Sequence, residues 1–144
     1  MNEVANKLAG IIDNVRELKG HDIDWAYKAS PAKWSKKEVI GHLIDSAQVN
    51  LQRFVRCTYE ENFRLTYEQV EWVAAAHYQD ADVNELIELW ALLNLQIVRV
   101  LTNYPPNRLG TRCDNSKQEP NLQTVEWLAA DYVDHMLHHL KGIL

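Results

Sequence analysis

The sequence predicts an all-α fold, a four-helix bundle with an additional short helix. Apolar residues recur at spacings of three and four along most of the 144 residues, which is the period of amphipathic helices. Only five glycines and four prolines interrupt this pattern, and strand signals are weak throughout. We therefore expect helices packed around one core, with residues 1–144 forming a single domain.

The first two helices are predicted at residues 2–19 and 35–57, joined by the loop 20–34. An apolar stripe marks the first helix: Val4, Leu8, Ile11, Val15 and Leu18. The second helix opens with the sequence SKKE, in which Ser35 and Glu38 can form a capping box. Its stripe continues to about residue 57 and contains Val39, Ile40, Leu43, Ala47, Leu51 and Phe54.

A short helix is predicted at about residues 67–76, and a longer helix follows a capping signal formed by Asp82 and Glu85. The apolar pattern of the longer helix ends before Pro105, because a residue that precedes proline disfavours the helical conformation. These two segments complete the set of helices that precede the final one.

Residues 105–120, PPNRLGTRCDNSKQEP, form the longest predicted loop, since they are polar and contain three prolines and one glycine. Long loops in compact domains are often functional or mobile. This loop either covers the mouth of a site or simply connects two helices. The last helix is predicted at residues 121–143.

The net charge of −5 and the scattered Lys and Arg residues argue against nucleic acid as a partner, because neutralising phosphates requires a basic face. No apolar run approaches the ~20 residues of a membrane span. The N-terminus lacks the basic and apolar regions of a secretory signal. We therefore expect a cytoplasmic protein in which Cys57 and Cys113 are free thiols.

Three of the six histidines lie close together in the run DYVDHMLHHLKGIL of the last helix. At about 100° per residue, His135 and His139 share the flank of the apolar face one turn apart, whereas His138 points toward the acidic face with Asp131 and Asp134. Two histidines at i and i+4 can bind one metal ion. The alternative is that both are amphipathic residues at the boundary of the core.

His42 of the second helix is the candidate third ligand. It lies on the flank of the apolar face, on a polar stripe with Ser46, Asn50 and Arg53. A single histidine in an amphipathic helix is usually a packed residue, but facing helices of a bundle can bring such flanks together. Asn50 and Arg53 are candidates for binding polar groups of a substrate, and a salt bridge is the alternative for Arg53.

Three neutral imidazoles, from His42, His135 and His139, would leave coordination positions open, as in catalytic metal sites. Zinc, nickel, iron or manganese would accept these ligands. Asp131 is a candidate for orienting an imidazole through a hydrogen bond, and His138 lies either beside the site or at the surface. The alternative for Asp131 is a solvated carboxylate.

Two blocks, KWSKKEVIGHLIDSAQVNLQRF (33–54) and TVEWLAADYVDHMLHHLKGIL (124–144), resemble the DinB-like superfamily, YfiT-like four-helix bundles described as metal-dependent hydrolases. The middle segment YEQVEWVAAAHYQD is also similar, so the resemblance spans nearly the whole chain. It implies a bundle in which His42, His135 and His139 hold a divalent metal ion.

The same resemblance implies an enzyme that acts on a small-molecule substrate, either a hydrolase that activates water or an S-transferase that activates a low-molecular-weight thiol. It also implies a homodimer, and we expect neither nucleic acid nor membrane as a partner. The alternatives are a non-catalytic metal-binding or ligand-binding bundle that dimerises through aromatic faces, and an interaction module without metal. The tryptophans could supply such faces, although most of them are more simply core residues: Trp25, Trp34, Trp72, Trp90 and Trp127.

Overall fold

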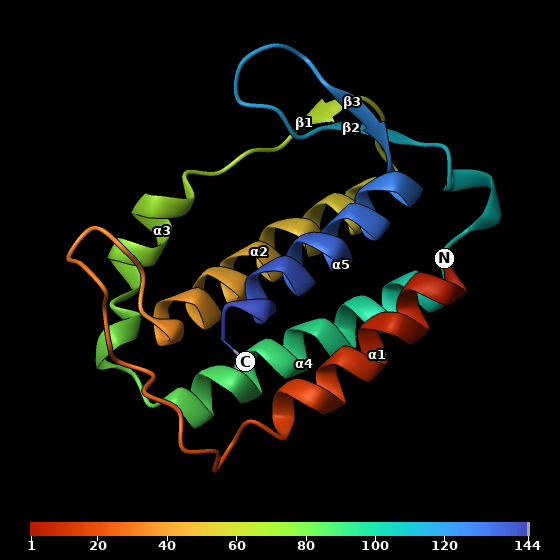
Figure 1. The fold of residues 1–144 in the computed structure, drawn as a ribbon. Coiled ribbons are helices and arrows are strands. Elements are labelled where there is room, and N and C mark those ends of the chain that lie inside the picture. Colours follow the sequence, from red (N-terminus) through yellow and green to blue (C-terminus); the bar gives the residue numbers. More distant parts are fainter. Residues whose placement is uncertain (144) are drawn as a thin grey trace.

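The computed structural model describes residues 1–143 and contains a four-helix bundle, a fifth short helix and a small sheet (Figure 1). The bundle helices are α1 (Asn2–Arg16), α2 (Lys36–Arg56), α4 (Val83–Thr102) and α5 (Val125–Lys141). The shorter elements are α3 (Gln69–Ala76) and two 3-10 helices, η1 (Tyr78–Asp80) and η2 (Pro106–Arg108). The predicted fold class is confirmed, and the sheet is an addition to it.

Each bundle helix packs against two neighbours. Helix α4 contacts α1 and α2, and helix α5 contacts α2 and α1. Figure 1 shows α2 and α5 side by side, running in opposite directions. The first half of α2 therefore lies beside the second half of α5, and residues about ninety positions apart in the sequence can share one site.

The core of the bundle is apolar and draws side chains from all five α-helices. Its largest fully buried side chains include Trp90, Phe54, Leu8, Ile12, Ile40, Leu43, Ile44, Ile87 and Ile97. Trp90 is the one tryptophan that is completely buried, whereas Trp72 and Trp127 are 37% and 45% exposed. Trp25 and Trp34 are partly buried and pack against the core, so most of the tryptophans belong to it, as expected.

Both predicted capping signals are present. The Ser35 hydroxyl accepts a hydrogen bond from the Glu38 N–H at 3.1 Å, and a Glu38 carboxylate oxygen accepts from the Ser35 N–H at 3.0 Å. The Asp82 carboxylate accepts from the N–H groups of Asn84 and Glu85. These bonds satisfy N–H groups that a helix start otherwise leaves unpaired, and they fix where α2 and α4 begin.

Two helices are shorter than predicted: α5, whose start is described below, and α1. This helix ends at Arg16 rather than at residue 19, and the chain then turns through Gly20, whose φ is 83°. A left-handed conformation of this kind favours glycine. In the described part of the chain, no helix is both long enough and apolar enough to cross a membrane.

A three-stranded sheet occupies segments that the sequence analysis assigned to loops and to the last helix. Strand β1 (Phe63–Arg64) pairs in parallel with β2 (Arg112–Asp114), which pairs antiparallel with β3 (Leu122–Thr124). The predictions of one loop over 105–120 and of a helix start near 121 are therefore wrong. The chain stays extended up to Thr124, whose hydroxyl accepts from the Trp127 N–H and caps α5.

Asp114 fixes the turn between β2 and β3. One of its carboxylate oxygens accepts hydrogen bonds from the Ser116 N–H, the Ser116 hydroxyl and the Asn121 N–H. These bonds hold the pKa of Asp114 below its usual value. The turn is thereby held over one end of the groove between α2 and α5.

Candidate metal centre

Three histidines from two helices meet in the bundle. His42 belongs to α2, and His135 and His139 belong to successive turns of α5. Their candidate ligand nitrogens all lie within 4.8 Å of one another, and the Nε2 atoms of His135 and His139 are 3.1 Å apart. The structure therefore brings together the three residues that the sequence analysis selected as metal ligands.

The environment of this triad favours neutral imidazoles. His42 is 1% exposed, and neither of its ring nitrogens has a hydrogen-bond partner within residues 1–143. Burial, together with the nearby His139 and His135, lowers the pKa of His42 to about 4. Burial also lowers the pKa of His139. At pH 7, His42 is therefore in the neutral form that binds metal ions.

The triad fits a divalent cation. Nitrogens bound to one zinc ion lie about 2.1 Å from it, so two of them at a tetrahedral angle are about 3.4 Å apart, close to the 3.1 Å between His135 and His139. A cation would also satisfy a buried nitrogen of His42, which otherwise costs free energy. No Asp, Glu or Cys of the described residues joins the group. Three imidazoles suit zinc, nickel, iron or manganese.

Trp34 covers the buried member of the triad. The centroid of its ring lies 4.9 Å from that of His42, and the two planes are inclined by 32°. Trp34 immediately precedes Ser35, so the capping box that starts α2 also places this ring. From the sequence, Trp34 is expected only to supply apolar area. Its position directly before the capping box was a signal that it lies near the start of the helix that carries His42.

His138 and Asp131 lie beside the triad. The exposed ring of His138 has its centroid 5.7 Å from that of His139, and it borders surface grooves on both of its sides. Asp131 is exposed and lines a pocket together with His135. Among the hydrogen bonds of residues 1–143, none joins Asp131 to an imidazole. Its role in orienting a histidine stays a prediction, as does the role of His138.

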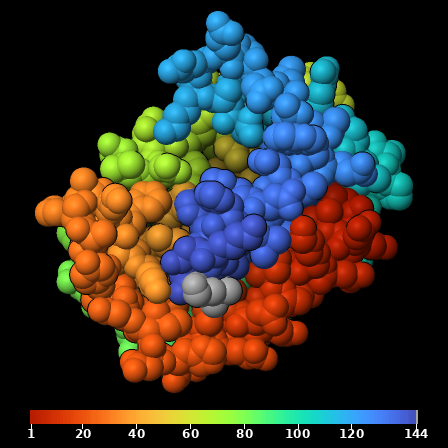
Figure 2. Space-filling view, viewed as in Figure 1, coloured from red at the N-terminus to blue at the C-terminus, as the bar shows by residue number. Residues whose placement is uncertain are grey.

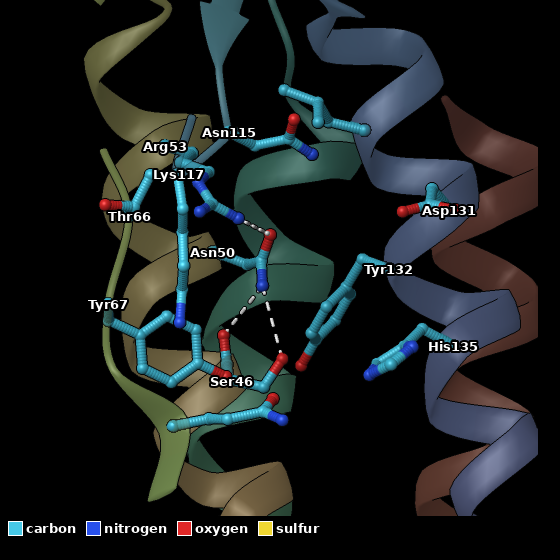
Figure 3. A pocket seen from close by; sticks show the side chains of 12 residues that line it. Ser46, Asn50, Arg53, Thr66, Tyr67, Asn115, Lys117, Asp131, Tyr132 and His135 are labelled. Atoms are coloured by element: carbon cyan, nitrogen blue, oxygen red, sulfur yellow. Dashed lines mark hydrogen bonds between the residues drawn. The ribbon is translucent and has the colours of Figure 1, made fainter. Parts of the chain in front are cut away.

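A polar pocket of about 220 Å³ opens beside His135, between α2, the segment after β1, the turn after β2, and α5 (Figure 3). In the space-filling view the same region is hollowed, with α2 visible at its floor between the green and blue segments (Figure 2). The pocket is lined by Ser46, Asn50, Arg53, Thr66, Tyr67, Gln69, Asn115, Lys117, Leu128, Asp131, Tyr132 and His135.

Asn50 and Arg53 are buried in the wall of this pocket and bonded to each other. Arg53 Nη1 donates to Asn50 Oδ1 at 3.2 Å, and Asn50 Nδ2 donates to the carbonyl of Ser46 at 2.9 Å. Arg53 Nε and Nη2 both donate to the carbonyl of Leu65. Both predicted substrate-binding residues therefore line the same pocket as His135, and the salt bridge considered for Arg53 is absent among residues 1–143.

Several lining residues could not be connected with the histidines from the sequence. Thr66 and Tyr67 follow β1, whereas Asn115 and Lys117 follow β2. The parallel pairing of β1 with β2 brings these distant segments together at the pocket. Strands of two or three residues leave almost no periodic signal in a sequence. The segment 105–120 is expected either to cover the mouth of a site or simply to connect two helices. Part of it, Asn115 and Lys117, lines the pocket.

Comparison with models of protein families gives a match between residues 11–143 and the DinB superfamily. No curated protein matches the sequence significantly. Among solved structures, the chain is similar to YfiT from Bacillus subtilis, described as a probable metal-dependent hydrolase with an unusual four-helix bundle topology. The two share 20% sequence identity with a TM-score of 0.81, over 99% of this chain and 81% of YfiT.

The chain is also similar to the crystal structure of a DinB-like protein, YjoA, from Bacillus subtilis. The sequence identity is 13% and the TM-score is 0.60, over 98% of this chain and 87% of that protein. At these identities, the likeness to both structures establishes the fold alone.

Proposed function

This chain belongs to the DinB superfamily, and we propose that it is a metal-dependent enzyme that acts on a small molecule. The observation that carries the proposal is a triad of histidines, with a neutral His42 at its buried end, directly beside a polar pocket that His135 also lines. The structural likeness to YfiT, which is described as a probable metal-dependent hydrolase, supports the same class of function.

His42, His135 and His139 would hold the cation, which we propose to be zinc, nickel, iron or manganese. When bound, such a cation supplies a Lewis acid that lowers the pKa of a coordinated water or thiol. The proposed reaction is therefore either hydrolysis, with water as the nucleophile, or S-transfer, with a low-molecular-weight thiol as the nucleophile.

The other residues of the site bind the substrate and shape its surroundings. His135 lines the pocket, so a substrate bound there presents one end to the triad. Asn50 and Arg53 bind polar groups of the substrate. Tyr132 forms part of the wall, because its hydroxyl already donates to Asn94 Oδ1 at 2.6 Å. Trp34 shields His42 from solvent.

The test is turnover by tag-free protein loaded with each of the four metals. One panel contains esters and amides, and the other contains low-molecular-weight thiols with small electrophiles. We expect turnover in one panel, and we expect His135→Ala to abolish it while His21→Ala, a change at an exposed loop residue, retains it. Turnover that survives in His135→Ala would contradict the proposed role of the triad.

A second candidate is a non-catalytic metal-binding or ligand-binding bundle. Exposed apolar side chains favour it, since Leu89 and Leu92 of α4 and Trp127 of α5 are 45%, 54% and 45% exposed. We propose a homodimer under either function, which light scattering would measure. Metal-loaded protein that is dimeric but turns over neither panel would favour the binding role over the enzyme.

A further inference from the structure

We infer that the pocket beside the triad binds the carboxylate of a small anionic substrate at Arg53, at the end away from the histidines. The inference about the reacting group at the other end of this substrate rests on the proposed function. Recognition of the carboxylate depends only on Arg53 and its neighbours, and it can be measured without metal.

Arg53 is a buried cation without an acidic partner. Its residue is 7% exposed, yet within residues 1–143 no carboxylate oxygen lies within 4.0 Å of its guanidinium. Three more exposed arginines each have a glutamate partner: Arg16 with Glu88, Arg56 with Glu60, and Arg108 with Glu61. An arginine stays protonated at pH 7, and a buried charge without a counter-charge costs free energy. The site therefore favours an anionic ligand.

The guanidinium is held in one orientation with donors to spare. Its Nε and Nη2 donate to the Leu65 carbonyl, and its Nη1 donates to Asn50, which is itself fixed by Ser46. A guanidinium has five N–H groups, so these three bonds leave one N–H on each terminal nitrogen. These two free N–H groups can donate hydrogen bonds to an anionic group of a ligand. Figure 3 shows Arg53 and Asn50 together on the α2 wall of the pocket.

The charges around the pocket direct an anion toward Arg53. Lys117 is a second cation that lines the pocket, although its ammonium lies 3.0 Å from a carboxylate oxygen of Glu68. Asp131 is the acidic lining residue, and it lies on α5, on the wall opposite Arg53 (Figure 3). Repulsion by Asp131 disfavours an anionic group near α5. A substrate with one carboxylate is thereby oriented with that group toward α2.

The helix geometry sets the size of the substrate. Asn50 follows His42 by eight residues, which is about 12 Å along the axis of α2. A molecule that reaches from the triad to the Asn50–Arg53 pair carries its carboxylate roughly 10 Å from its reacting group. The pocket volume of about 220 Å³ requires a small molecule. The substrate class is therefore a small carboxylic acid with a thiol or a scissile bond at its other end.

The test compares 8-mercaptooctanoate with its uncharged amide, because the two share the thiol and the length and differ in charge. Binding to the Co²⁺-loaded protein is followed by the absorption of the metal. We expect the acid to bind at least about 10-fold more tightly than the amide, since a hydrogen-bonded charge pair contributes about that much. The short 3-mercaptopropionate should lose this advantage, because it cannot span the distance.

Two arginine variants localise the effect. Arg53→Met should remove the preference for the acid, whereas Arg99→Met, which removes one positive charge from the exposed face of α4, should leave it unchanged. Equal affinity of the acid and the amide in the parent protein would overturn the inference, whether or not Arg53→Met folds. A preference that persists in folded Arg53→Met would overturn it as well.

A metal-free measurement separates this inference from the proposed function. In an NMR titration of the apoprotein, the acid should shift the signals of Arg53 Nε–H and of the Asn50 side-chain amide, and the amide should not. Protein that binds no Co²⁺ yet shows these shifts would contradict the proposed function and support carboxylate recognition. Protein that binds Co²⁺ without these shifts would support the proposed metal site and contradict carboxylate recognition.

Discussion

Two helices of the bundle, α1 and α2, bury different kinds of side chain. Helix α1, which packs against α4, buries apolar residues alone within its length: Ala5, Leu8, Ile11, Ile12 and Val15. Helix α2, which faces α5, buries apolar residues and also His42, Asp45, Ser46, Asn50 and Arg53. Both helices are amphipathic, so the difference between them is the buried polar stripe of α2.

This difference indicates where function has taken precedence over stability. Burying polar and charged groups costs free energy unless they are paired. In α2, both ring nitrogens of His42 and one carboxylate oxygen of Asp45 are buried without a partner in the described structure. A bundle that needed only stability would fill these positions with apolar side chains. Helix α1 therefore contributes apolar burial alone, whereas α2 combines apolar burial with the polar residues of the site.

The largest expected difference in stability is between substitutions of one glycine in each of these two helices. A Cβ on Gly41 would overlap the ring of Tyr78, and this ring is held in place by a hydrogen bond to Asp45. Gly41→Ala should therefore destabilise the fold by about 3 kcal/mol. Gly10 of α1 has open space around it, and Gly10→Ala should stabilise the helix by about 0.5–1 kcal/mol. Urea unfolding measures the change in free energy of unfolding for each variant. Similar changes in Gly41→Ala and Gly10→Ala would contradict the prediction.

The next largest effect is a pH dependence that arises from His42. Burial lowers its pKa from 6.5 in the unfolded chain to about 4 in the folded protein. Above pH 6.5 neither state binds the proton; between pH 6.5 and 4 only the unfolded chain binds it, so stability falls as the pH falls. The loss should reach about 3 kcal/mol near pH 4 in metal-free protein.

His42→Gln provides the comparison for this pH effect, because glutamine does not titrate. Chemical unfolding at pH 7 and pH 4 should show a loss of stability that is smaller in His42→Gln than in the parent by about 3 kcal/mol. His21→Gln, a change at an exposed loop residue, should keep the full pH dependence of the parent. Identical pH profiles of His42→Gln and the parent would contradict the assignment.

A smaller effect is expected from the capping of the two helices. Helix α2 starts with a complete capping box at Ser35, whereas the N-cap of α1, Met1, makes no side-chain capping bond. Ser35→Ala should reduce the free energy of unfolding by about 1 kcal/mol. Asn2→Ala, at the exposed start of α1, should change it by less than about 0.5 kcal/mol. Thermal unfolding of the two variants would decide whether the start of α2 is the more strongly specified.

The smallest effect should come from the ion pair between Lys7 of α1 and Asp134 of α5. The two atoms that form it are 3.1 Å apart, and the side chains are 51% and 71% exposed. Solvent screens such a pair, so Lys7→Met should change stability by less than about 0.5 kcal/mol. A loss above 1 kcal/mol in urea unfolding would show that this ion pair contributes to the packing of α1 against α5.

Much of the fold could be predicted because helices leave a regular signal. The 3.6-residue period and the capping residues Ser35 and Asp82 indicated the helices, and helical geometry placed His135 and His139 on one flank and His138 on another. The pairing of α2 with α5 was suggested by His42 together with the resemblance to a known family. Neither the period nor the caps specify which helices become neighbours.

The remainder depended on contacts between distant segments. The strands are two or three residues long, too short for a period to be recognised, so β2 was assigned to a loop and β3 to the start of a helix. The pocket is completed by Tyr67 and Lys117, which come near α2 only through the pairing of β1 with β2. That Arg53 lacks an acidic partner is likewise a property of the tertiary structure.

The central claim is that the polar stripe of α2 and the end of α5 together form a metal site. Its most direct test is a titration of tag-free apoprotein with Co²⁺ at pH 7, followed by absorption spectroscopy. We predict one equivalent bound, an affinity more than about 100-fold weaker in His42→Ala, and an unchanged affinity in His21→Ala, at an exposed loop residue. No saturable binding by the parent protein, or equal affinity of the parent and His42→Ala, would contradict the claim.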